Sequence, residues 1–182
     1  MRLVILGGPG AGKGTQGRRL CEALEIPSIA TGDIFRAAIA DRTELGDKAA
    51  PYVERGDLVP DELTIEFMRD RLTKPDAKQG WLLDGYPRTA FQAEELSFLL
   101  SDLGQRLDWA IWFDVPVPVM MKRSLSRSRD DDAPEIIRRR IDLFHNRTIP
   151  IVEFYEMRGR LLRIDASRDA DTIHQDVLAQ IG

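Results

Sequence analysis

The first stretch of the sequence that could bind a ligand is a glycine-rich loop near the N-terminus. The apolar run Leu3–Leu6 leads into residues 7–15, Gly-Gly-Pro-Gly-Ala-Gly-Lys-Gly-Thr, and a helical pattern follows to Leu24. Glycines allow consecutive backbone N–H groups to point inward at a phosphate, and the following helix adds the positive end of its dipole. This order of strand, loop, lysine and helix is the context that the phosphate-binding P-loop motif requires. We therefore predict a nucleoside triphosphate site at Gly10, Ala11, Gly12, Lys13, Gly14 and Thr15.

Lys13 has the clearest chemical use in this loop, because a lysine can reach the β- and γ-phosphates as a mobile point charge. In the P-loop pattern a Ser or Thr follows the lysine directly. Gly14 stands there in this chain, and the hydroxyl comes one residue later, at Thr15. A hydroxyl beside the lysine helps to organise Mg²⁺, so Thr15 is a candidate for that role. GTPases, ATPases and small-molecule kinases share such loops, and a glycine-rich turn with an incidental lysine is the structural alternative.

Two further motifs occur in a fixed order after the loop. Residues 30–33 are Ala-Thr-Gly-Asp, with Arg36 one turn into the next helix, and residues 80–89 are Gly-Trp-Leu-Leu-Asp-Gly-Tyr-Pro-Arg-Thr, with Gln92 three residues on. Together with the glycine loop, and with residues 113–116 and the arginines after them, these motifs resemble adenylate kinases over essentially the whole chain. The resemblance implies the reaction Mg·ATP + AMP ⇌ 2 ADP, with ATP and AMP as ligands and Mg²⁺ as cofactor.

The resemblance also implies residues for the AMP side. Arg36 and Arg88 match the arginines that hold the α-phosphate, a role for which a guanidinium suits because it binds phosphate bidentately. Gln92 matches the glutamine that contacts the adenine, and Thr31 matches a threonine against the base. UMP/CMP kinases usually carry Ala in place of this Thr and Asn near the Gln, so the pair favours AMP. The set implied here is Thr31, Arg36, Asp57, Leu58, Val59, Gly85, Tyr86, Pro87, Arg88, Gln92, Arg129 and Arg140.

Some of these residues have structural interpretations that the sequence leaves open. Thr89 and Gln92 form a capping box ahead of a leucine-striped helix, and Thr31 is a good N-cap residue. From spacing alone, Arg36 is a solvated helix residue. Pro60-Asp61, after the AMP-side segment, also simply starts a helix.

Asp84 ends an apolar strand, where its carboxylate can hold Mg²⁺ through water, because Mg²⁺ keeps much of its hydration shell. A strand-end turn aspartate is the alternative. Between residues 122 and 147 there are eight basic and five acidic residues, in a chain of net charge −4. Bound polyphosphate would explain this local positive charge. A salt-bridged helix face is the alternative, which we accept for Arg138 and Arg139.

The resemblance implies roles in phosphate binding for several of these basic residues. Arg127 and Arg168 are expected on the ATP side, and Arg168 follows the strand expected at residues 161–165. The residues expected to carry the transfer itself are Lys13, Asp84, Arg88, Arg123, Arg129 and Arg140. None is assigned as a general base, because the acceptor is already a phosphate oxygen.

Residues 126–132 correspond to the lid of the family, which many bacterial members extend by a few dozen residues, sometimes with four zinc-binding cysteines. This segment is too short for such a lid, and Cys21 is the only cysteine, so we expect no zinc. Asp131 and Asp132 match the paired lid aspartates, with Asp130 as an extra acid. We expect one domain over residues 1–182, with an AMP-binding excursion at 30–59 and a short lid at 126–132.

The elements that must position these residues follow from hydrophobic patterning. Short apolar runs separated by helical stretches are typical of parallel strands buried on both faces. They predict an α/β, doubly wound, parallel five-stranded sheet flanked by helices, with ligands at the carboxyl ends of the strands. The expected strands are Leu3–Leu6, Ser28–Ala30, Trp81–Asp84, Trp109–Asp114 and Leu161–Asp165.

Helices are expected between these strands. A leucine stripe predicts one from Ala90 to Leu103, stopped by Gly104, and the last helix is expected to begin near Asp169. Residues 31–59 are expected to contain helical pieces interrupted by Gly46, Pro51 and Gly56.

Length and composition limit the remaining choices. A chain of 182 residues fits one domain, and 43 % apolar with 31 % charged residues is ordinary globular composition. The acidic net charge argues against a nucleic-acid-binding protein. No apolar run approaches a membrane span, and the apolar start is too short for a signal peptide. We expect a cytoplasmic monomer. A UMP/CMP kinase and a nucleotide sensor without chemistry are the competing interpretations.

Overall fold

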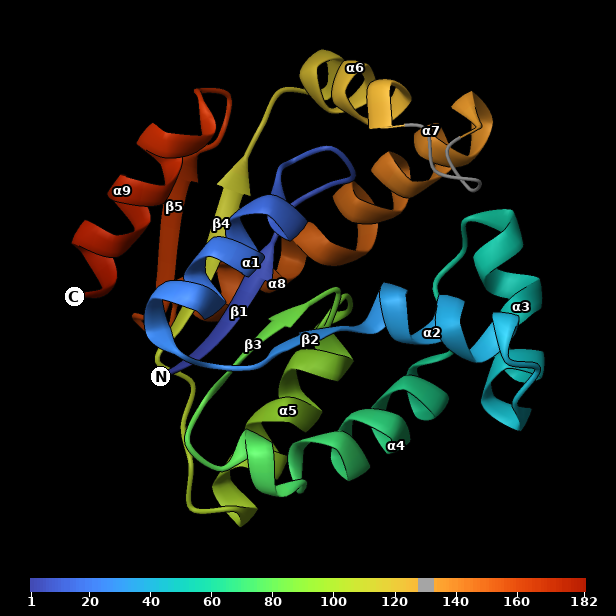
Figure 1. Cartoon of the computed structure of the whole chain (residues 1–182), viewed down its shortest axis with the longest axis horizontal. Helices are drawn as coiled ribbons and strands as arrows, with labels where there is room; N and C mark the ends of the chain where they lie inside the picture. Colours follow the sequence, from blue (N-terminus) through green and yellow to red (C-terminus); the bar gives the residue numbers. More distant parts are fainter. Residues whose placement is uncertain (128–132) are drawn as a thin grey trace.

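The computed structural model describes residues 1–127 and 133–182. Five strands form one parallel sheet in the order β2-β3-β1-β4-β5, with helices on both faces (Figure 1). This is the doubly wound α/β fold that the apolar runs predicted. The strands are β1 Arg2–Leu6, β2 Ser28–Ala30, β3 Trp81–Asp84, β4 Trp109–Asp114 and β5 Leu161–Asp165. Only β1 differs from its predicted bounds, by one residue.

The helices connect consecutive strands and extend beyond the sheet on one side. They are α1 Lys13–Leu24, α2 Thr31–Ala40, α3 Glu44–Arg55, α4 Asp61–Leu72, α5 Ala90–Asp102, α6 Val117–Arg127, α7 Pro134–Leu143, α8 Ile149–Glu156 and α9 Ala170–Ile181, with a 3₁₀ turn η1 at Pro75–Ala77 and a π-helical segment η2 at Phe144–Thr148. Within the described ranges, no helix is both long and apolar enough to cross a membrane.

Alternating side chains of β1 belong to two separate cores, one on each face of the sheet. Leu3 and Ile5 pack with residues of α1 and α9, whereas Val4 and Leu6 pack with residues of α5 and α8. All four side chains are at most 2 % exposed. A strand buried on both faces cannot shift register without moving every side chain to the wrong core. The sheet is therefore a rigid base for the loops at its carboxyl edge.

The ends of α5 carry the residues that the sequence predicted, and α9 begins where it was expected. The Thr89 side chain accepts a hydrogen bond from the Gln92 N–H at the start of α5, and Gly104 follows its end with φ 64°. The Asp169 side chain caps α9 by accepting from the N–H groups of Asp171 and Thr172. These caps satisfy N–H groups that have no partner within the helix.

Helices α2 and α3 form an arm with a small core, against which Leu63 of α4 also packs. Phe35, Ala49 and Val59 are its buried apolar residues. One part of the prediction for this region was wrong, because α3 runs through both Gly46 and Pro51, and the break lies at residues 41–43.

Packing and exposure explain why α3 is continuous. A Cβ at Gly46 would lie 2.1 Å from the carbonyl oxygen of Ala38, so this glycine allows α3 to approach α2 closely. Pro51 is exposed, and the carbonyl of Asp47 that it leaves without a helical partner is on an exposed residue too. Gly56 ends α3 with φ 72°, as predicted.

Candidate active site

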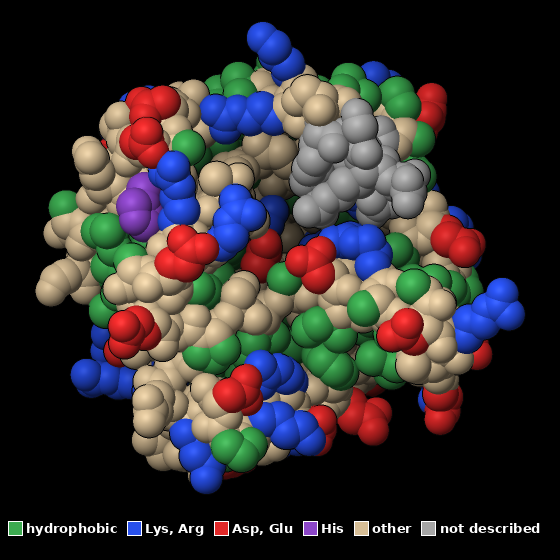
Figure 2. Space-filling model, viewed as in Figure 1, with side chains coloured by type: hydrophobic (Ala, Val, Ile, Leu, Met, Phe, Trp, Pro, Cys, Tyr) green, Lys and Arg blue, Asp and Glu red, His purple; other side chains and the backbone are tan. Residues whose placement is uncertain are grey.

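A cavity of about 1070 Å³ opens where β1, β2 and β3 end and α1 begins. Figure 2 shows it as a hollow near the centre of the face, with basic and acidic side chains at its rim. Its place at the carboxyl ends of the strands is the one expected for this fold. The predicted site residues that line it are Gly10, Ala11, Gly12, Lys13, Gly14, Thr15, Thr31, Arg36, Asp57, Leu58, Val59, Asp84, Gly85, Pro87, Arg88, Gln92, Arg123 and Arg140.

Two predicted residues do not line this cavity. Tyr86 is 2 % exposed, and its hydroxyl donates to the Gln92 carbonyl oxygen at 3.2 Å. Burial raises the pKa of this hydroxyl, helped by the charges of Glu95 and Asp61, so it remains a neutral donor. Arg168 donates to the Asp165 carbonyl oxygen at 3.2 Å and pairs with Asp176 of α9.

Some predicted residues cannot be placed. Arg129, the side chain of Arg127 and residues 130–132, which contain the expected lid acids, lie outside the described residues.

The glycine loop between β1 and α1 wraps the base of the cavity. Gly10 and Gly12 have φ of 74° and 90°, and Gly12 is the N-cap of α1 with no side-chain cap. The first turn of α1 therefore presents backbone N–H groups and its positive dipole end at the cavity. The Nζ of Lys13 donates to the carbonyl oxygens of Gly7 at 2.7 Å and Gly8 at 3.0 Å, which holds the ammonium against the loop.

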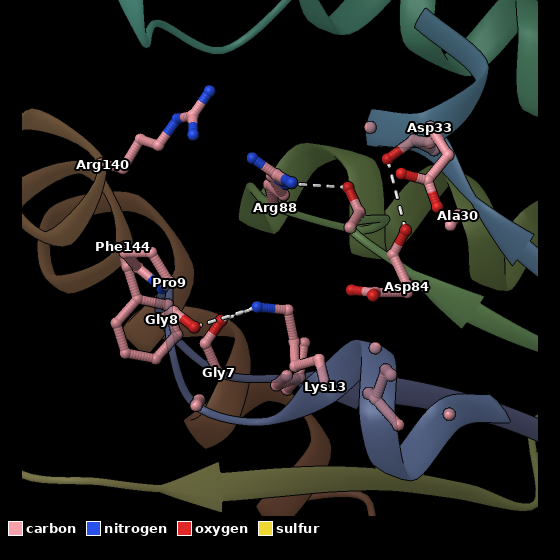
Figure 3. A pocket seen from close by; sticks show the side chains of 18 of the residues that line it. Gly7, Gly8, Pro9, Lys13, Ala30, Asp33, Asp84, Arg88, Arg140 and Phe144 are labelled. Carbon is pink, nitrogen blue, oxygen red and sulfur yellow. Dashed lines mark hydrogen bonds between the residues drawn. The ribbon is translucent and has the colours of Figure 1, made fainter. Parts of the chain in front are cut away.

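Three arginines from separate elements also line the cavity. Arg88 follows β3, Arg36 lies on α2 and Arg140 lies on α7. In Figure 3, Arg88 and Arg140 extend toward the same open space. Desolvation lowers the pKa of the Arg88 guanidinium, the Asp84 carboxylate opposes this, and the charges of Arg140 and Arg36 lower it further. A guanidinium keeps its proton at neutral pH, so the three charges make the cavity attractive to a polyanion.

Hydrogen bonds to the backbone hold two of the predicted arginines in place. The Arg88 Nε donates to the Gly85 carbonyl oxygen at 2.9 Å. Arg123 donates to the carbonyl oxygens of Ala166 at 2.8 Å and Ser167 at 3.1 Å. Arg123 therefore ties the loop after β5 to α6 while it lines the cavity.

Thr31 and Gly85 lie together where β2 and β3 end. The N-cap of α2 is Ala30, so Thr31 is not the cap that the sequence suggested. Its hydroxyl donates to the Asp84 carbonyl oxygen at 3.4 Å. A Cβ at Gly85 would lie 2.6 Å from the Thr31 Oγ1 and 2.9 Å from an Arg88 nitrogen, and Gly85 has φ 86°. Only glycine allows these two side chains to approach the chain here.

The capping box at the start of α5 is half formed. Thr89 accepts from the Gln92 N–H at 3.2 Å, but the Gln92 side chain does not return to Thr89. Its Oε1 accepts from the Arg88 N–H at 2.7 Å and its Nε2 donates to the Asp61 Oδ1 at 2.8 Å. Gln92 is 2 % exposed and lines the cavity.

An ion pair connects the arm to α7. Asp57, just after α3, pairs with Arg139 of α7 and with Arg55. Desolvation would raise the pKa of the Asp57 carboxyl, but hydrogen bonds and charges from Arg139 and Arg55 outweigh it, and its pKa is lowered. Arg139 is thus salt-bridged, as the sequence predicted.

Removing this charge should loosen the arm in a pH-dependent way. Asp57→Asn is expected to lower the unfolding midpoint at neutral pH by about 1–3 °C, since partly exposed ion pairs contribute at most about 1 kcal/mol. Because the folded-state pKa is lowered, this stabilisation is present above the ordinary aspartate pKa of about 3.9 and is lost as the pH falls. Thermal unfolding at neutral pH and near pH 3 measures both. Glu54→Gln, on the exposed side of α3, is the control, and an equal destabilisation at both pH values would contradict the role of the charge.

Sequence reasoning missed three cavity residues that follow Arg140 in the chain, which are Leu143, Phe144 and Thr148. Phe144 and Thr148 are the two ends of the π-helical segment η2. The Thr148 hydroxyl donates to the Arg88 carbonyl oxygen at 3.1 Å. Pro150, which lacks the N–H that would bond to residue 146, was the one signal of an irregular helix here.

Comparison with known proteins gives the same assignment along the whole chain. The family model described as adenylate kinase matches residues 5–160. Adenylate kinase 2 of Nostoc sp. (strain PCC 7120) is 57 % identical over 178 residues, which cover 98 % of this chain and 97 % of that protein. Adenylate kinase 2 of Synechocystis sp. (strain PCC 6803) is 53 % identical over 181 residues, covering all of both chains.

A more distant relative differs in length. Adenylate kinase of Shouchella clausii is 39 % identical over an alignment of 210 residues that covers 98 % of this chain and 97 % of that protein. Since the alignment is longer than the 182 residues of this chain, that relative contains residues that this chain lacks. The short form predicted from the sequence agrees with this difference. With the P-loop fold and matches of this extent, the chain belongs to the adenylate kinase family.

Proposed function

We propose that the cavity binds Mg·ATP and AMP end to end, so that the γ-phosphoryl group passes directly to AMP and two ADP result. The observation that carries this is the convergence, on one cavity, of the glycine loop with Lys13 and three arginines from separate elements. Two polyanions facing each other repel strongly. Fixed positive charges on several sides weaken this repulsion and stabilise the negative charge that builds on the phosphoryl group during transfer.

The glycine loop, Lys13 and Thr15 form the ATP side. Backbone N–H groups of the loop hold the phosphates, and the Lys13 ammonium leaves the carbonyls of Gly7 and Gly8 for the β- and γ-phosphate oxygens. Arg123, which already organises the loop after β5, would contact the phosphates from the α6 side. Arg127 and Arg129 stay predictions for the same group.

Arg88, Arg36 and Gln92 form the AMP side. The two arginines hold the α-phosphate that accepts the phosphoryl group, and Arg140 bridges toward the donor. Thr31, Leu58 and Val59, which line the cavity with Gln92, enclose the base. A phosphate oxygen of AMP is already a nucleophile. The protein therefore has to position the two nucleotides and neutralise their phosphate charges, and no side chain has to remove a proton.

The residues present suit Mg²⁺ that arrives with ATP. Asp84 and Thr15 both line the cavity and are oxygen donors, and an ion that keeps several waters requires few protein ligands. Bound there, Mg²⁺ neutralises donor-phosphate charge. Among the described residues no group of three or more His, Cys, Asp or Glu side chains could hold a metal ion. A resident zinc site is not part of the proposal.

Movement of the arm is the proposed means of excluding water. The arm, which corresponds to the AMP-binding excursion expected at residues 30–59, has a small core apart from the two cores of the sheet, and it would move over AMP. The short lid at residues 126–132 would close over ATP. Exclusion of water prevents hydrolysis of the donor. We further propose that the enzyme acts as a cytoplasmic monomer.

A panel of acceptors tests the proposal. With Mg·ATP as donor, ADP formation measured with AMP, CMP, UMP and GMP offered singly should be fast only with AMP, and a control without acceptor should show almost no hydrolysis. Preference for CMP or UMP would leave the phosphate site standing but overturn the roles of Thr31 and Gln92. Binding of both nucleotides without turnover would favour a sensor instead.

A further inference from the structure

We infer that Asp61 sets the base specificity of the acceptor site, by fixing the direction of the Gln92 side-chain amide. The inference rests on the proposed function, in which Gln92 contacts the acceptor base. Asp61 is the first residue of α4 and is not among the residues that line the cavity. It is therefore a positioning residue.

The Gln92 amide has a protein partner at each end. Its Nε2 donates to the Asp61 Oδ1 at 2.8 Å, and its Oε1 accepts from the Arg88 backbone N–H at 2.7 Å. A carboxylate oxygen accepts only and a backbone N–H donates only. These two partners therefore dictate which end of the amide is nitrogen and which is oxygen.

Asp61 is itself held by a second donor. The Thr89 hydroxyl donates to its Oδ2 at 3.0 Å, while the same hydroxyl oxygen accepts from the Gln92 N–H at 3.2 Å. Both carboxylate oxygens are thus engaged with α5. The result is a closed set of contacts among Asp61, Thr89 and Gln92 that joins α4 to the first turn of α5.

A fixed amide can still bind a base, because each of its ends retains capacity. An amide nitrogen carries two hydrogens and an amide oxygen two lone pairs. After the bonds to Asp61 and Arg88, one N–H and one lone pair remain for the cavity.

This remaining pair matches one class of purine. A 6-aminopurine offers a donor at N6 and an acceptor at N1, which are complementary to an amide oxygen and an amide N–H. A 6-oxopurine offers the reverse, an acceptor at O6 and a donor at N1, and would require the amide to turn over.

Turning the amide over is costly at both ends. The Gln92 oxygen would then face the carboxylate of Asp61, and the Gln92 NH₂ would face the N–H of Arg88. Each mismatch leaves a buried polar group without a partner, and the one at Asp61 involves a charge. A 6-oxopurine is rejected because the protein resists the rotamer that would accept it.

The test compares AMP with IMP, which differ at the 6-position of the base. In Asp61→Asn the side chain keeps its shape, but it can donate as well as accept and no longer forces the amide direction. The ratio of kcat/KM for AMP to kcat/KM for IMP is expected to fall about 10- to 100-fold, the worth of a hydrogen bond to a charged group. The KM for Mg·ATP and the thermal midpoint should change little.

Two controls separate positioning from a general loss of structure. Glu62→Gln removes the same charge from the neighbouring exposed residue of α4, and it should leave the ratio unchanged. In a Gln92→Ala background, Asp61→Asn should no longer change the ratio, because Asp61 acts through the Gln92 amide. If Asp61→Asn folds poorly, Thr89→Val removes the donor that holds the Asp61 carboxylate, and a smaller fall in the ratio is expected.

The outcomes keep this inference distinct from the proposed function. A wild-type enzyme that strongly prefers AMP, with an unchanged ratio in both Asp61→Asn and Thr89→Val, would overturn the role of Asp61 alone. A fall in the ratio that persists in the Gln92→Ala background would also overturn it. Wild-type enzyme that uses IMP as well as AMP would overturn both the amide direction and the proposed contact of Gln92 with the base.

Discussion

Arg88→Ala is expected to lower the rate of phosphoryl transfer by about 10³-fold or more, the scale of a transition-state arginine in phosphoryl transfer. In the proposed complex Arg88 holds the accepting α-phosphate. Its Nε donates to the carbonyl oxygen of Gly85, and it lies near the charges of Arg36 and Arg140. Its removal leaves growing negative charge without its nearest guanidinium. Single-turnover measurement of ADP formation from saturating Mg·ATP and AMP reports the transfer step.

The fold should survive this substitution. Arg88 is desolvated and lies near Arg140 and Arg36 as well as near Asp84, so its loss removes a desolvation cost and two repulsions along with one attraction, and the thermal midpoint should change little. Arg88→Lys keeps a charge but not the planar fork, and an intermediate rate is expected. Arg138→Ala is the control, because Arg138 is an exposed residue of α7 two positions before Arg140. Near-normal transfer by Arg88→Ala would refute the assigned role.

Lys13→Met is expected to lower kcat by about 10²- to 10³-fold, the usual cost of losing one fixed positive donor at a reacting centre. Methionine retains the length and apolar stem of lysine but cannot reach phosphate oxygens as a cation. The two bonds from Nζ to the loop carbonyls are lost as well. Since those carbonyls border an open cavity, water can replace the ammonium, and thermal unfolding should be little changed.

Steady-state kinetics with varied Mg·ATP, beside thermal unfolding, measures both effects. Lys74→Met is a matched control, because Lys74 lies in the connection that follows α4 and pairs there with Asp70. A mutant that keeps kcat but shows a raised KM for Mg·ATP would mean that Lys13 contributes to ground-state binding only.

The sheet was predictable almost residue by residue, because β1, β3 and most of β4 are apolar runs buried on both faces and the two outer strands, β2 and β5, are shorter apolar runs between helical stretches. The same reasoning failed in the arm. Gly46 and Pro51 are helix breakers by local propensity, yet α3 continues through both. The packing of α3 on α2 keeps the helix continuous there. Local propensity does not include such contacts between segments.

Eighteen of the site residues predicted from motifs line one cavity. They do so because a P-loop and the residues at strand ends have a fixed place in this fold. The motifs did not identify the residues that orient these side chains. Asp61 looked like an ordinary helix start, and its bonds to Gln92 and Thr89 join residues about thirty positions apart. Arg168 followed the right strand but turns to Asp176. Side-chain direction at an exposed loop depends on neighbours that a motif does not specify.

The π-helical segment η2 has a geometric consequence for the helix that contains it. Arg140, Phe144 and Thr148 are spaced by four residues and all line the cavity. In a straight α-helix each residue turns about 100°, so eight residues would leave Thr148 about 80° out of line with Arg140. A π turn contains one residue more than an α turn, so the eight positions wind about as far as seven and the mismatch falls to about 20°.

The extra residue of the π turn therefore brings positions 140 and 148 back onto the same side of the helix. It keeps the Arg140 guanidinium, the Phe144 ring and the Thr148 hydroxyl on the same side of the continuous helix formed by α7, η2 and α8. If residues 144–148 were α-helical with no residue removed, either Arg140 or Thr148 would rotate away from the cavity.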